Sequence, residues 1–448
     1  MRIRAARPFI YFVERYYPDP IIFAALATLL TFLLALFLTD SNATTAIMAW
    51  GNGLSSLMTF IAQISLTLLT GHALAHIKPI LRLLDRIASI PKNDSMAYAM
   101  TLFFSGIASL ISWAFGLVIG GLLAYRVAVN GKERGLQIHY PLLVASGYSG
   151  FVMWHMGYSG SAQLFVATPG HVLEQSIGTI PVTETLLQPY NIMATLLLLL
   201  ILPIVMVIMK PHKSKIVELK IKTVEKPEYE FHNPKDSSSI TPGQKLERQR
   251  WINIFLGTAL IIYLILHWLE KGFDLNLNIV NWSFLAIGLL LVSSPIEYVK
   301  LITNASKIVG QIIFQYPFYA GIMGMMMGTG LVQVFASWFI TISTPTTLAF
   351  WAFISGGILN LFVPSGGGQW TIQGPIFIEA ANELGVAYTS IINGIAWGDQ
   401  WTNMIQPIWT IPILAIAGLK VRDIMGYTFV TLIVSGFIFS FFLLFFAQ

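Results

Sequence analysis

Residues 360–375 read NLFVPSGGGQWTIQGP, and they place a proline, a serine and three consecutive glycines inside a run without charge that extends from residue 308 to residue 378. In hydrocarbon, backbone that leaves the helical conformation is tolerated only where protein buries it or where it lines a watery cavity. The stretch therefore predicts the tip of a re-entrant hairpin that faces a binding site. Glycine lets a ligand approach the backbone closely, and a helix that starts after the break offers N–H groups to an anion.

The composition is that of a polytopic membrane protein. Of 448 residues, 55% are hydrophobic and 10% are charged, whereas charged residues make up about a quarter of a soluble domain. Apolar runs long enough to cross a bilayer recur, for example at residues 21–39, 192–209, 252–269 and 424–447. The chain has no cysteine, which excludes disulfides and cysteine-based metal sites. Most of the net charge of +5 lies in short loops, where it orients helices, so we expect a lipid bilayer and no nucleic acid as partner.

Basic residues predict which loops lie in the cytoplasm. Four arginines precede the first apolar run, so we expect a multi-pass protein of the inner (cytoplasmic) membrane with a cytoplasmic N-terminus and an external C-terminus. Residues 95–125 form an uncharged run that is too long for one span and has basic residues before and after it. Both ends are therefore expected on the cytoplasmic side, which predicts a first hairpin with its tip in residues 105–116. Residues 348–378 predict a second hairpin, entered from outside.

The most polar part of the chain divides it into two repeats. Residues 210–250 hold ten Lys or Arg and six Asp or Glu and no run long enough to span, which predicts a cytoplasmic linker. Residues 1–209 form the first membrane repeat, and residues 251–448 form a connecting span and a second repeat. Because the connecting span is one extra crossing, the second repeat is inverted, a plan typical of secondary transporters. The expected fold is an all-α polytopic membrane protein with two inverted-topology repeats, each with a re-entrant helical hairpin and a broken transmembrane helix.

Two further breaks, GYSGSAQLFVATPG at residues 157–170 and GDQWTNMIQP at residues 398–407, complete the candidate site. Neutral donors dominate these breaks, which suits a small anion or a desolvated cation. The candidate substrate-binding residues are Ser159, Gly160, Ser161, Ser365, Gly366, Gly367, Gly368, Gln369 and Trp370. The candidate residues for a coupling ion are Asp399, Gln400, Thr402 and Asn403. The candidate pocket walls are Ser112, Trp113, Thr168 and Trp401.

Asp399 is the sole carboxylate between Glu383 and Asp423. Burying it without compensation is costly, so we expect a bound cation, a proton or a nearby donor. The residues leave H⁺ and Na⁺ open, with Na⁺ near Asp399 as the one metal to consider. His72 and His155 are most often structural histidines, and a proton-relay role is the alternative for either.

Several long motifs resemble the short-chain fatty acid transporter family of the AtoE type, which is grouped with a wider ion-transporter superfamily. They are YYPDPIIFAALATLLTF, TGHALA at residues 70–75, PSGGGQW followed by IQGP, GDQWTNMIQP and AGLKVRDIMGY, so the resemblance covers nearly the whole chain. It implies uptake of acetoacetate and butyrate, paired re-entrant hairpins and an elevator-like homodimer. An acidic residue, often Glu, is expected at position 399, and the shorter Asp399 bears on substrate or ion preference.

Three classes of function remain to be compared. The first is a secondary transporter that imports short-chain monocarboxylates by symport with H⁺ or Na⁺ and alternating access. A small-solute channel or facilitator without ion coupling is the second, although paired hairpins in inverted halves favour alternating access. An enzyme is the third, and the sequence has no zinc-type His spacing, nucleophile elbow, nucleotide-binding glycine loop or Walker motif. We therefore expect neither catalysis nor a cofactor.

Overall fold

The computed structural model describes residues 20–158, 160–167, 171, 173–219, 241–272, 277–364 and 366–447. Within these residues the regular structure is helical, and no β-strand is present. The helices long and apolar enough to cross a membrane are α6 (Asp94–Ile111), α12 (Pro189–Ile208), α14 (Arg250–Lys271) and α22 (Val421–Phe445). Two bent helix pairs raise the number of candidate spans in the described residues from 4 to 6 if each pair is one span. This architecture agrees with the expected all-helical, multi-pass membrane protein.

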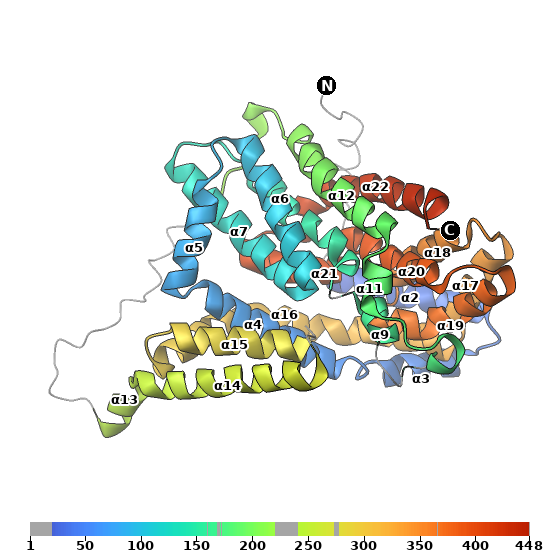
Figure 1. Cartoon of the computed structure of the whole chain (residues 1–448), viewed down its shortest axis with the longest axis horizontal. Coiled ribbons are helices and arrows are strands. Elements are labelled where there is room, and N and C mark those ends of the chain that lie inside the picture. Colours follow the sequence, from blue (N-terminus) through green and yellow to red (C-terminus); the bar gives the residue numbers. More distant parts are fainter. Residues whose placement is uncertain are drawn as a thin grey trace.

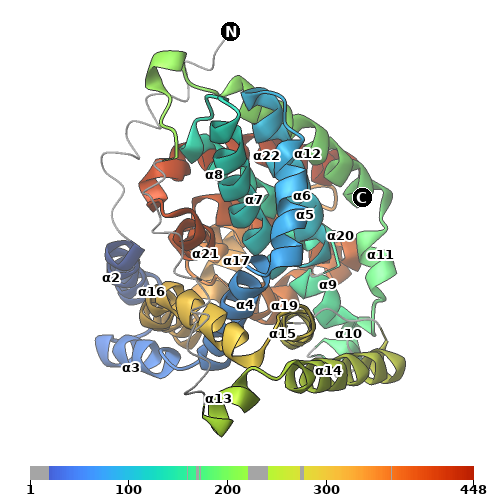
Figure 2. The ribbon, with the colours of Figure 1, turned by 90° about the vertical axis from the view of Figure 1, so that its left-hand side faces the viewer.

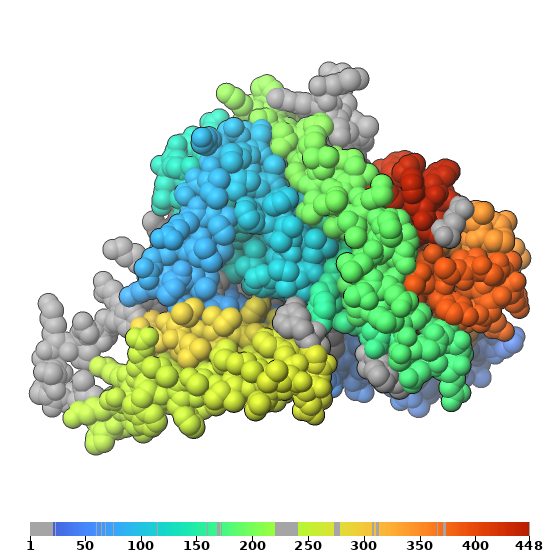
Figure 3. Space-filling view, viewed as in Figure 1, coloured from blue at the N-terminus to red at the C-terminus, as the bar shows by residue number. Residues whose placement is uncertain are grey.

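One group of helices forms a layer along the lower part of Figure 1. Its members are α2 (Pro20–Leu38), α3 (Ala43–Gly53), α4 (Met58–Ala75), α14, α15 (Leu277–Leu291) and α16 (Pro295–Gly328). Helix α16 packs on α2, α3 and α4, while α15 lies between α4 and α14. A Cβ on Gly53 would lie 2.7 Å from the carbonyl oxygen of Ala320, so small residues allow α3 and α16 to pack backbone to backbone. In Figure 3, α14 and α15 cover the lower part of the visible face.

From α4 onward in the first half and from α16 onward in the second, the helices follow the same order. Helices α4 and α5 (Lys78–Ser89) are bent by 81°, and α16 and α17 (Leu331–Thr341) are bent by 64°. Each bent pair is followed by two further helices, α6 and α7 (Trp113–Glu133) in the first half and α18 (Leu348–Asn360) and α19 (Gly366–Leu384) in the second. The breaks at Ser112 and at residues 361–364 both fall inside the segments expected as hairpins. That either segment forms a re-entrant hairpin in a bilayer stays a prediction.

A broken helix follows each hairpin. In the first half, α8 (Tyr140–Ser149) continues as a 3₁₀ helix (Gly150–Met156) and stops before the short α9 (Ser161–Val166). In the second half, α20 (Tyr388–Thr402) continues as a 3₁₀ turn (Asn403–Ile405) and stops before α21 (Pro407–Ala417). The first half then adds α10 (Glu174–Ile177) and α11 (Val182–Leu186), and α12 and α22 close the two halves. Figures 1 and 2 show α6, α7, α12 and α22 above the layer of α4, α14 and α15.

The second break differs from the sequence expectation in its position. The whole stretch from residue 398 to residue 407 was expected as an interruption beside Asp399. In the structure, α20 remains helical through Thr402, and the chain leaves the helix only at residues 403–406. Pro407 then occupies the first turn of α21, a position that tolerates its missing N–H group. Asp399 therefore projects from a regular helix one turn before the break.

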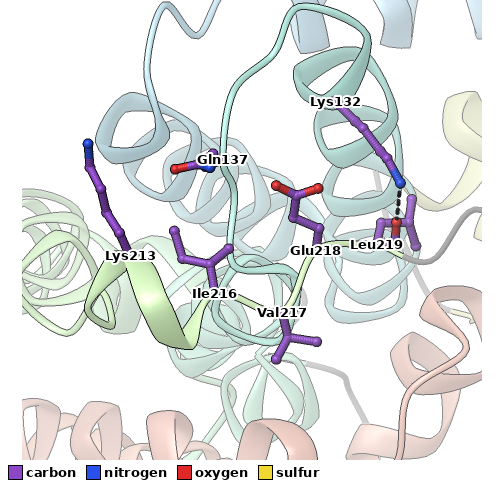
Figure 4. A pocket seen from close by; sticks show the side chains of 7 residues that line it. All are labelled: Lys132, Gln137, Lys213, Ile216, Val217, Glu218 and Leu219. Carbon is purple, nitrogen blue, oxygen red and sulfur yellow. Dashed lines mark hydrogen bonds between the residues drawn. The ribbon is translucent and has the colours of Figure 1, made fainter.

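The start of the linker lies against the ends of α7 and α8. Nζ of Lys132 donates a hydrogen bond of 3.1 Å to the carbonyl oxygen of Leu219. The N–H of Tyr140 donates to the carbonyl oxygen of Val217 at 2.8 Å. A surface pocket opens there (Figure 4), lined by Lys132, Gln137, Lys213, Ile216, Val217, Glu218 and Leu219. Further along, α13 (Pro242–Glu247) precedes α14. The boundaries of the linker and of the two repeats stay predictions.

Candidate functional site

A buried histidine and aspartate join the two broken helices. Nε2 of His155, in the 3₁₀ helix that follows α8, lies 2.9 Å from Oδ2 of Asp399 in α20. The two side chains are 0% and 2% exposed. An unpaired buried carboxylate would cost several kcal/mol, and the imidazole N–H offsets part of that cost. The expected donor near Asp399 is thus a residue 244 positions away in the sequence.

Three contacts fix the orientation of the His155 ring and its backbone. The N–H of Ser161, the first residue of α9, donates to Nδ1 at 3.2 Å. The ring lies on the indole of Trp154, with ring centres 3.5 Å apart. The backbone N–H of His155 donates to Oε1 of Gln400 at 2.8 Å. Because Nδ1 accepts a hydrogen bond, the neutral imidazole carries its proton on Nε2. The Nε2–H group then donates a hydrogen bond to Asp399.

The N-terminus of α19 touches this pair. A Cβ on Gly366 would lie 2.6 Å from Oδ2 of Asp399 and 2.9 Å from Nε2 of His155. Glycine is required there, since any side chain would displace the pair. A Cβ on Gly367 would meet no described atom within 4 Å, so of these two glycines Gly366 makes the close approach. Gly368 continues the same first turn of α19, and Ser365 lies outside the described residues.

Gln369 and Trp370 hold α19 against its surroundings. Nε2 of Gln369 donates to the carbonyl oxygen of Gly356 in α18 at 2.8 Å and lies 3.1 Å from Oε1 of Gln373. The indole of Trp370 is fully buried, and a Cβ on Gly374 would lie 3.0 Å from it. The structure thus brings both residues into the packing around α18 and α19.

Amide and hydroxyl side chains join the end of α20 to α18. Nδ2 of Asn360 lies 2.7 Å from the carbonyl oxygen of Asp399, 3.0 Å from Oγ1 of Thr402 and 2.7 Å from Oδ1 of Asn403. Oγ1 of Thr402 donates to the carbonyl oxygen of Gly357 at 2.8 Å. Thr402 and Asn403 therefore face α18, whereas Gln400 contacts the backbone of His155.

The first break meets the tip of the first hairpin. The N–H of Tyr158 donates to the carbonyl oxygen of Leu110 at 2.8 Å. A Cβ on Gly160 would lie 2.8 Å from the carbonyl oxygen of His155, so the chain turns tightly there. Nε2 of Gln163 lies 3.0 Å from that same carbonyl oxygen and 3.0 Å from Oδ1 of Asn393 in α20. Leu110, near the break at Ser112, and Gly366, at the start of α19, therefore both lie against residues of the broken helices.

The expected pocket walls have different surroundings. Ser112 joins α6 to α7 and is buried, and the Trp113 ring centre lies 6.4 Å from that of Trp154, which covers His155. Trp401 packs 4.8 Å from Phe353 of α18, and its Nε1 donates to the carbonyl oxygen of Leu432 in α22 at 2.6 Å. This places Trp401 in the packing between α18, α20 and α22. Ser159 and Thr168 lie outside the described residues.

Several buried acceptors near the breaks have no donor in the part of the chain that the structure describes. They are Oδ1 of Asp399, Oε1 of Gln163 and Oε1 of Gln369. Buried polar atoms are normally hydrogen-bonded, so a bound proton or cation at Asp399 would remove an unfavourable state. In the part of the chain that the structure describes, no group of three or more His, Cys, Asp and Glu side chains could hold a metal ion.

Three buried amide side chains of this region are not among the residues that the sequence predicts for the site. Asn360 bonds to the end of α20 and the turn after it. Nδ2 of Asn393 donates to the carbonyl oxygen of Thr185 at 3.0 Å and to Oη of Tyr190 at 2.8 Å. Nε2 of Gln406 donates to the carbonyl oxygen of Asn360. All three are fully or almost fully buried. An amide inside an otherwise apolar run is the signal that would have found them.

Comparison with known proteins identifies relatives over the whole chain. The family model described as short chain fatty acid transporter matches residues 1–446. A protein of Escherichia coli (strain K12) is 41% identical over 439 residues, which cover 97% of this chain and 98% of that protein. A protein of Haemophilus influenzae (strain ATCC 51907 / DSM 11121 / KW20 / Rd) is 38% identical over 445 residues, with 97% and 98% covered. Both bear the name "Putative short-chain fatty acid transporter".

Solved structures give more distant similarities. The YdaH transporter of Alcanivorax borkumensis aligns with a TM-score of 0.44 at 14% sequence identity, over 95% of this chain and 98% of that one. MtrF of Neisseria gonorrhoeae aligns with a TM-score of 0.38 at 14% identity, over 98% and 97%.

Proposed function

The chain belongs to the short-chain fatty acid transporter family, and we propose that it imports short-chain monocarboxylates such as acetoacetate and butyrate by cation-coupled symport with alternating access. One observation carries this proposal: the N-terminus of α19 meets the Asp399–His155 pair between two broken helices. Non-helical backbone that meets a buried ionisable group is the arrangement in which membrane transporters bind substrates and ions.

We propose that the substrate carboxylate binds between residues 365–370 and residues 159–161. Backbone N–H groups and neutral side chains supply the donors there. The described part of this region brings no Lys or Arg into an ion pair with Asp399. A monoanion therefore binds without a fixed cationic partner, and a mobile cation supplies the compensating charge at Asp399.

Charge compensation also explains the need for coupling. An anion that enters the cell alone works against an inside-negative potential, at about 2.3 kcal/mol per charge per 100 mV. A monocarboxylate that moves with one H⁺ or one Na⁺ is electrically neutral. Symport thus removes the electrical cost and lowers the cost of desolvating the anion.

Alternating access in this proposal rests on two inverted repeats. The matching order of bent pair, hairpin, broken helix and closing helix supports it. We further propose that the chain lies in the inner membrane with a cytoplasmic N-terminus, works as a homodimer and moves its two hairpins in an elevator-like step. The alternative is a channel or facilitator for the same solutes without ion coupling.

Uptake by purified protein in proteoliposomes tests the proposal. With labelled butyrate or acetoacetate and independently imposed Na⁺ and pH gradients, we expect saturable accumulation against the substrate gradient under at least one cation gradient. Equilibration without accumulation under every gradient would favour the facilitator instead.

Asp399→Asn tests the assignment of the coupling residue. Asparagine keeps an oxygen that can accept the His155 N–H but carries no charge, so gradient-driven accumulation should disappear while exchange of substrate across the membrane persists. Glu379→Gln, which removes an exposed carboxylate from α19, is the matched control and should behave like the wild type. Accumulation that survives in Asp399→Asn would make Asp399 a structural residue.

A further inference from the structure

We propose that the coupling ion is a proton bound by Asp399, and that His155 acts as a positioning residue that sets the pH of proton binding through one tautomer, which the backbone N–H of Ser161 enforces. This inference rests on the proposed transport function and names the ion that the function leaves open.

The hydrogen bonds of His155 leave its ring one neutral arrangement. The Ser161 N–H points at Nδ1, so Nδ1 must offer its lone pair and the ring proton must lie on Nε2. Nε2–H then donates to Oδ2 of Asp399 at 2.9 Å. In the opposite tautomer two donors would meet at Nδ1, and two acceptors would meet between Nε2 and Oδ2. The first break therefore controls whether Asp399 receives a hydrogen bond.

Asp399 has one oxygen available for a proton. Oδ2 already accepts from His155, whereas Oδ1 is buried and has no hydrogen-bond partner among the described residues. Binding of H⁺ at Oδ1 forms one O–H bond, converts the carboxylate to a neutral acid and leaves the Nε2–H···Oδ2 hydrogen bond in place. Release of the proton reverses the step. The charge of the pair changes from −1 to 0, which is the change that a bound monoanion requires.

The surroundings of the pair favour a proton over Na⁺. A metal cation of this kind binds through several oxygen ligands. Among the described residues, Asp399 offers one unengaged oxygen and the ring of His155 occupies the other. The neutral oxygens expected to help hold a cation already accept hydrogen bonds, Oε1 of Gln400 from the N–H of His155 and Oδ1 of Asn403 from Asn360. A proton needs one oxygen only.

Other titratable groups do not reach the pair. On α20, on the 3₁₀ helix that carries His155 and on the elements that pack against either, they are Asp94, Tyr98, Tyr125, Arg126, Lys132, Glu133, Tyr140, Tyr148, Glu184, Tyr190, Glu379, Glu383, Tyr388, Arg422, Asp423 and Tyr427. Among the described residues, none of them forms a hydrogen bond or an ion pair with Asp399 or His155. Glu184, Glu379, Glu383 and Arg422 are exposed, and Tyr190 bonds to Asn393. The pH dependence of the site therefore belongs to the pair.

The position of Ser161 permits a substitution that removes only the controlling N–H. Proline has no N–H and is tolerated at the first position of a helix, which Ser161 occupies in α9. Gly160, which precedes it, has φ −57° and ψ 114°, close to the extended conformation that a residue before proline adopts. Ser161→Ala keeps the N–H and is the matched control.

The experiment measures the pH at which substrate uptake into proteoliposomes is half-maximal, at constant Na⁺. A donor to a carboxylate stabilises its ionised form, so loss of that donor makes proton binding easier. We expect His155→Leu to move the midpoint upward by about one pH unit. Ser161→Pro should move it in the same direction. His155→Gln, whose amide can donate to Oδ2, should stay near the wild-type midpoint. Ser161→Ala keeps the N–H that contacts His155, so its midpoint should also stay, and the rate of uptake separately measures what its hydroxyl contributes to substrate binding.

Three outcomes separate the inference from the function on which it rests. Wild-type accumulation driven by a Na⁺ gradient at equal pH on both sides would overturn the inference and leave the transport function standing. Unshifted midpoints in both His155→Leu and Ser161→Pro would overturn the role of His155. No uptake by the wild type under any gradient would overturn the function and the inference with it. Should Ser161→Pro fail to fold, judged by its melting in detergent, the two His155 variants decide the question.

Discussion

Gly366 and Gly367 are neighbours in the chain with opposite surroundings. A Cβ at position 366 would overlap Asp399 and His155, while a Cβ at position 367 would meet nothing within 4 Å. We therefore expect Gly366→Ala to abolish uptake, because the pair must move apart, at a cost of about 1–3 kcal/mol for overpacking. Gly367→Ala should retain uptake. Rates in proteoliposomes and melting temperatures in detergent measure both effects, and equal loss of activity in the two variants would contradict the expected close approach.

At the scale of residues, the sequence singled out Asp399 as an ionisable group that needs a partner, and the structure places His155 against it. It could not identify that partner, because His155 lies 244 positions away and only the packing of two broken helices brings them together. The same limit applies to Gly366. Three glycines in a row all permit close approach, and only the direction in which α19 starts decides which one makes it.

At the scale of elements, His139 lies at the start of α8 and connects the linker to α6 and α22. It lies between α7 and α8, where Nδ1 accepts from the N–H of Val217 at 3.0 Å and Nε2 lies 3.0 Å from Oη of Tyr427 in α22. Its backbone N–H donates to Oη of Tyr98 in α6 at 2.8 Å. Burial disfavours the charged imidazole and lowers the pKa of His139 to about 4. A protonated ring would also oppose the Val217 N–H with a second donor.

This contact predicts a loss of stability in acid. Because the unfolded chain binds a proton near pH 6.5 and the folded chain only near pH 4, the contribution of His139 is complete above pH 6.5 and falls as the pH drops toward 4, by up to about 3 kcal/mol. His139→Gln, which does not titrate there, should have a melting temperature in detergent that depends less on pH between 7 and 4. Parallel curves for the two proteins would refute this assignment.

Also at the scale of elements, the sequence predicted the stretches in which helices end at Ser112, at residues 361–364 and at residues 403–406, since glycine and proline inside apolar runs mark where a helix must end. It was less accurate about the ends of elements. The helix around Asp399 continues through Thr402 because residues 398–402 bond to α18, for example from Oγ1 of Thr402 to Gly357, and packing then outweighs the local preference of glycine. The basic stretch after α4 forms α5, whose apolar residues recur with helical spacing.

At the scale of the whole molecule, charge and hydropathy predicted an all-helical membrane protein, and the family is confirmed by relatives along nearly the full chain. Charge and hydropathy could not predict that six helices gather in one layer, namely α2, α3, α4, α14, α15 and α16. That layer combines helices from both halves and depends on contacts such as Gly53 against Ala320, which leave no periodic signal in the sequence.

The orientation of the two halves in the bilayer gives the last prediction. If basic loops are cytoplasmic and residues 252–269 add one crossing, the two repeats have opposite orientations, and the ends of α11 and α22 face outward. The chain has no cysteine, so single cysteines can report sidedness without interference. In intact cells, an impermeant thiol reagent should label Glu184→Cys and Gln448→Cys and should reach Lys245→Cys only after lysis; Glu184 and Lys245 are exposed, and Gln448 follows the described residues. Labelling of Gln448→Cys from the cytoplasmic side alone would contradict inversion, because an uninverted second repeat returns the C-terminus to the cytoplasm.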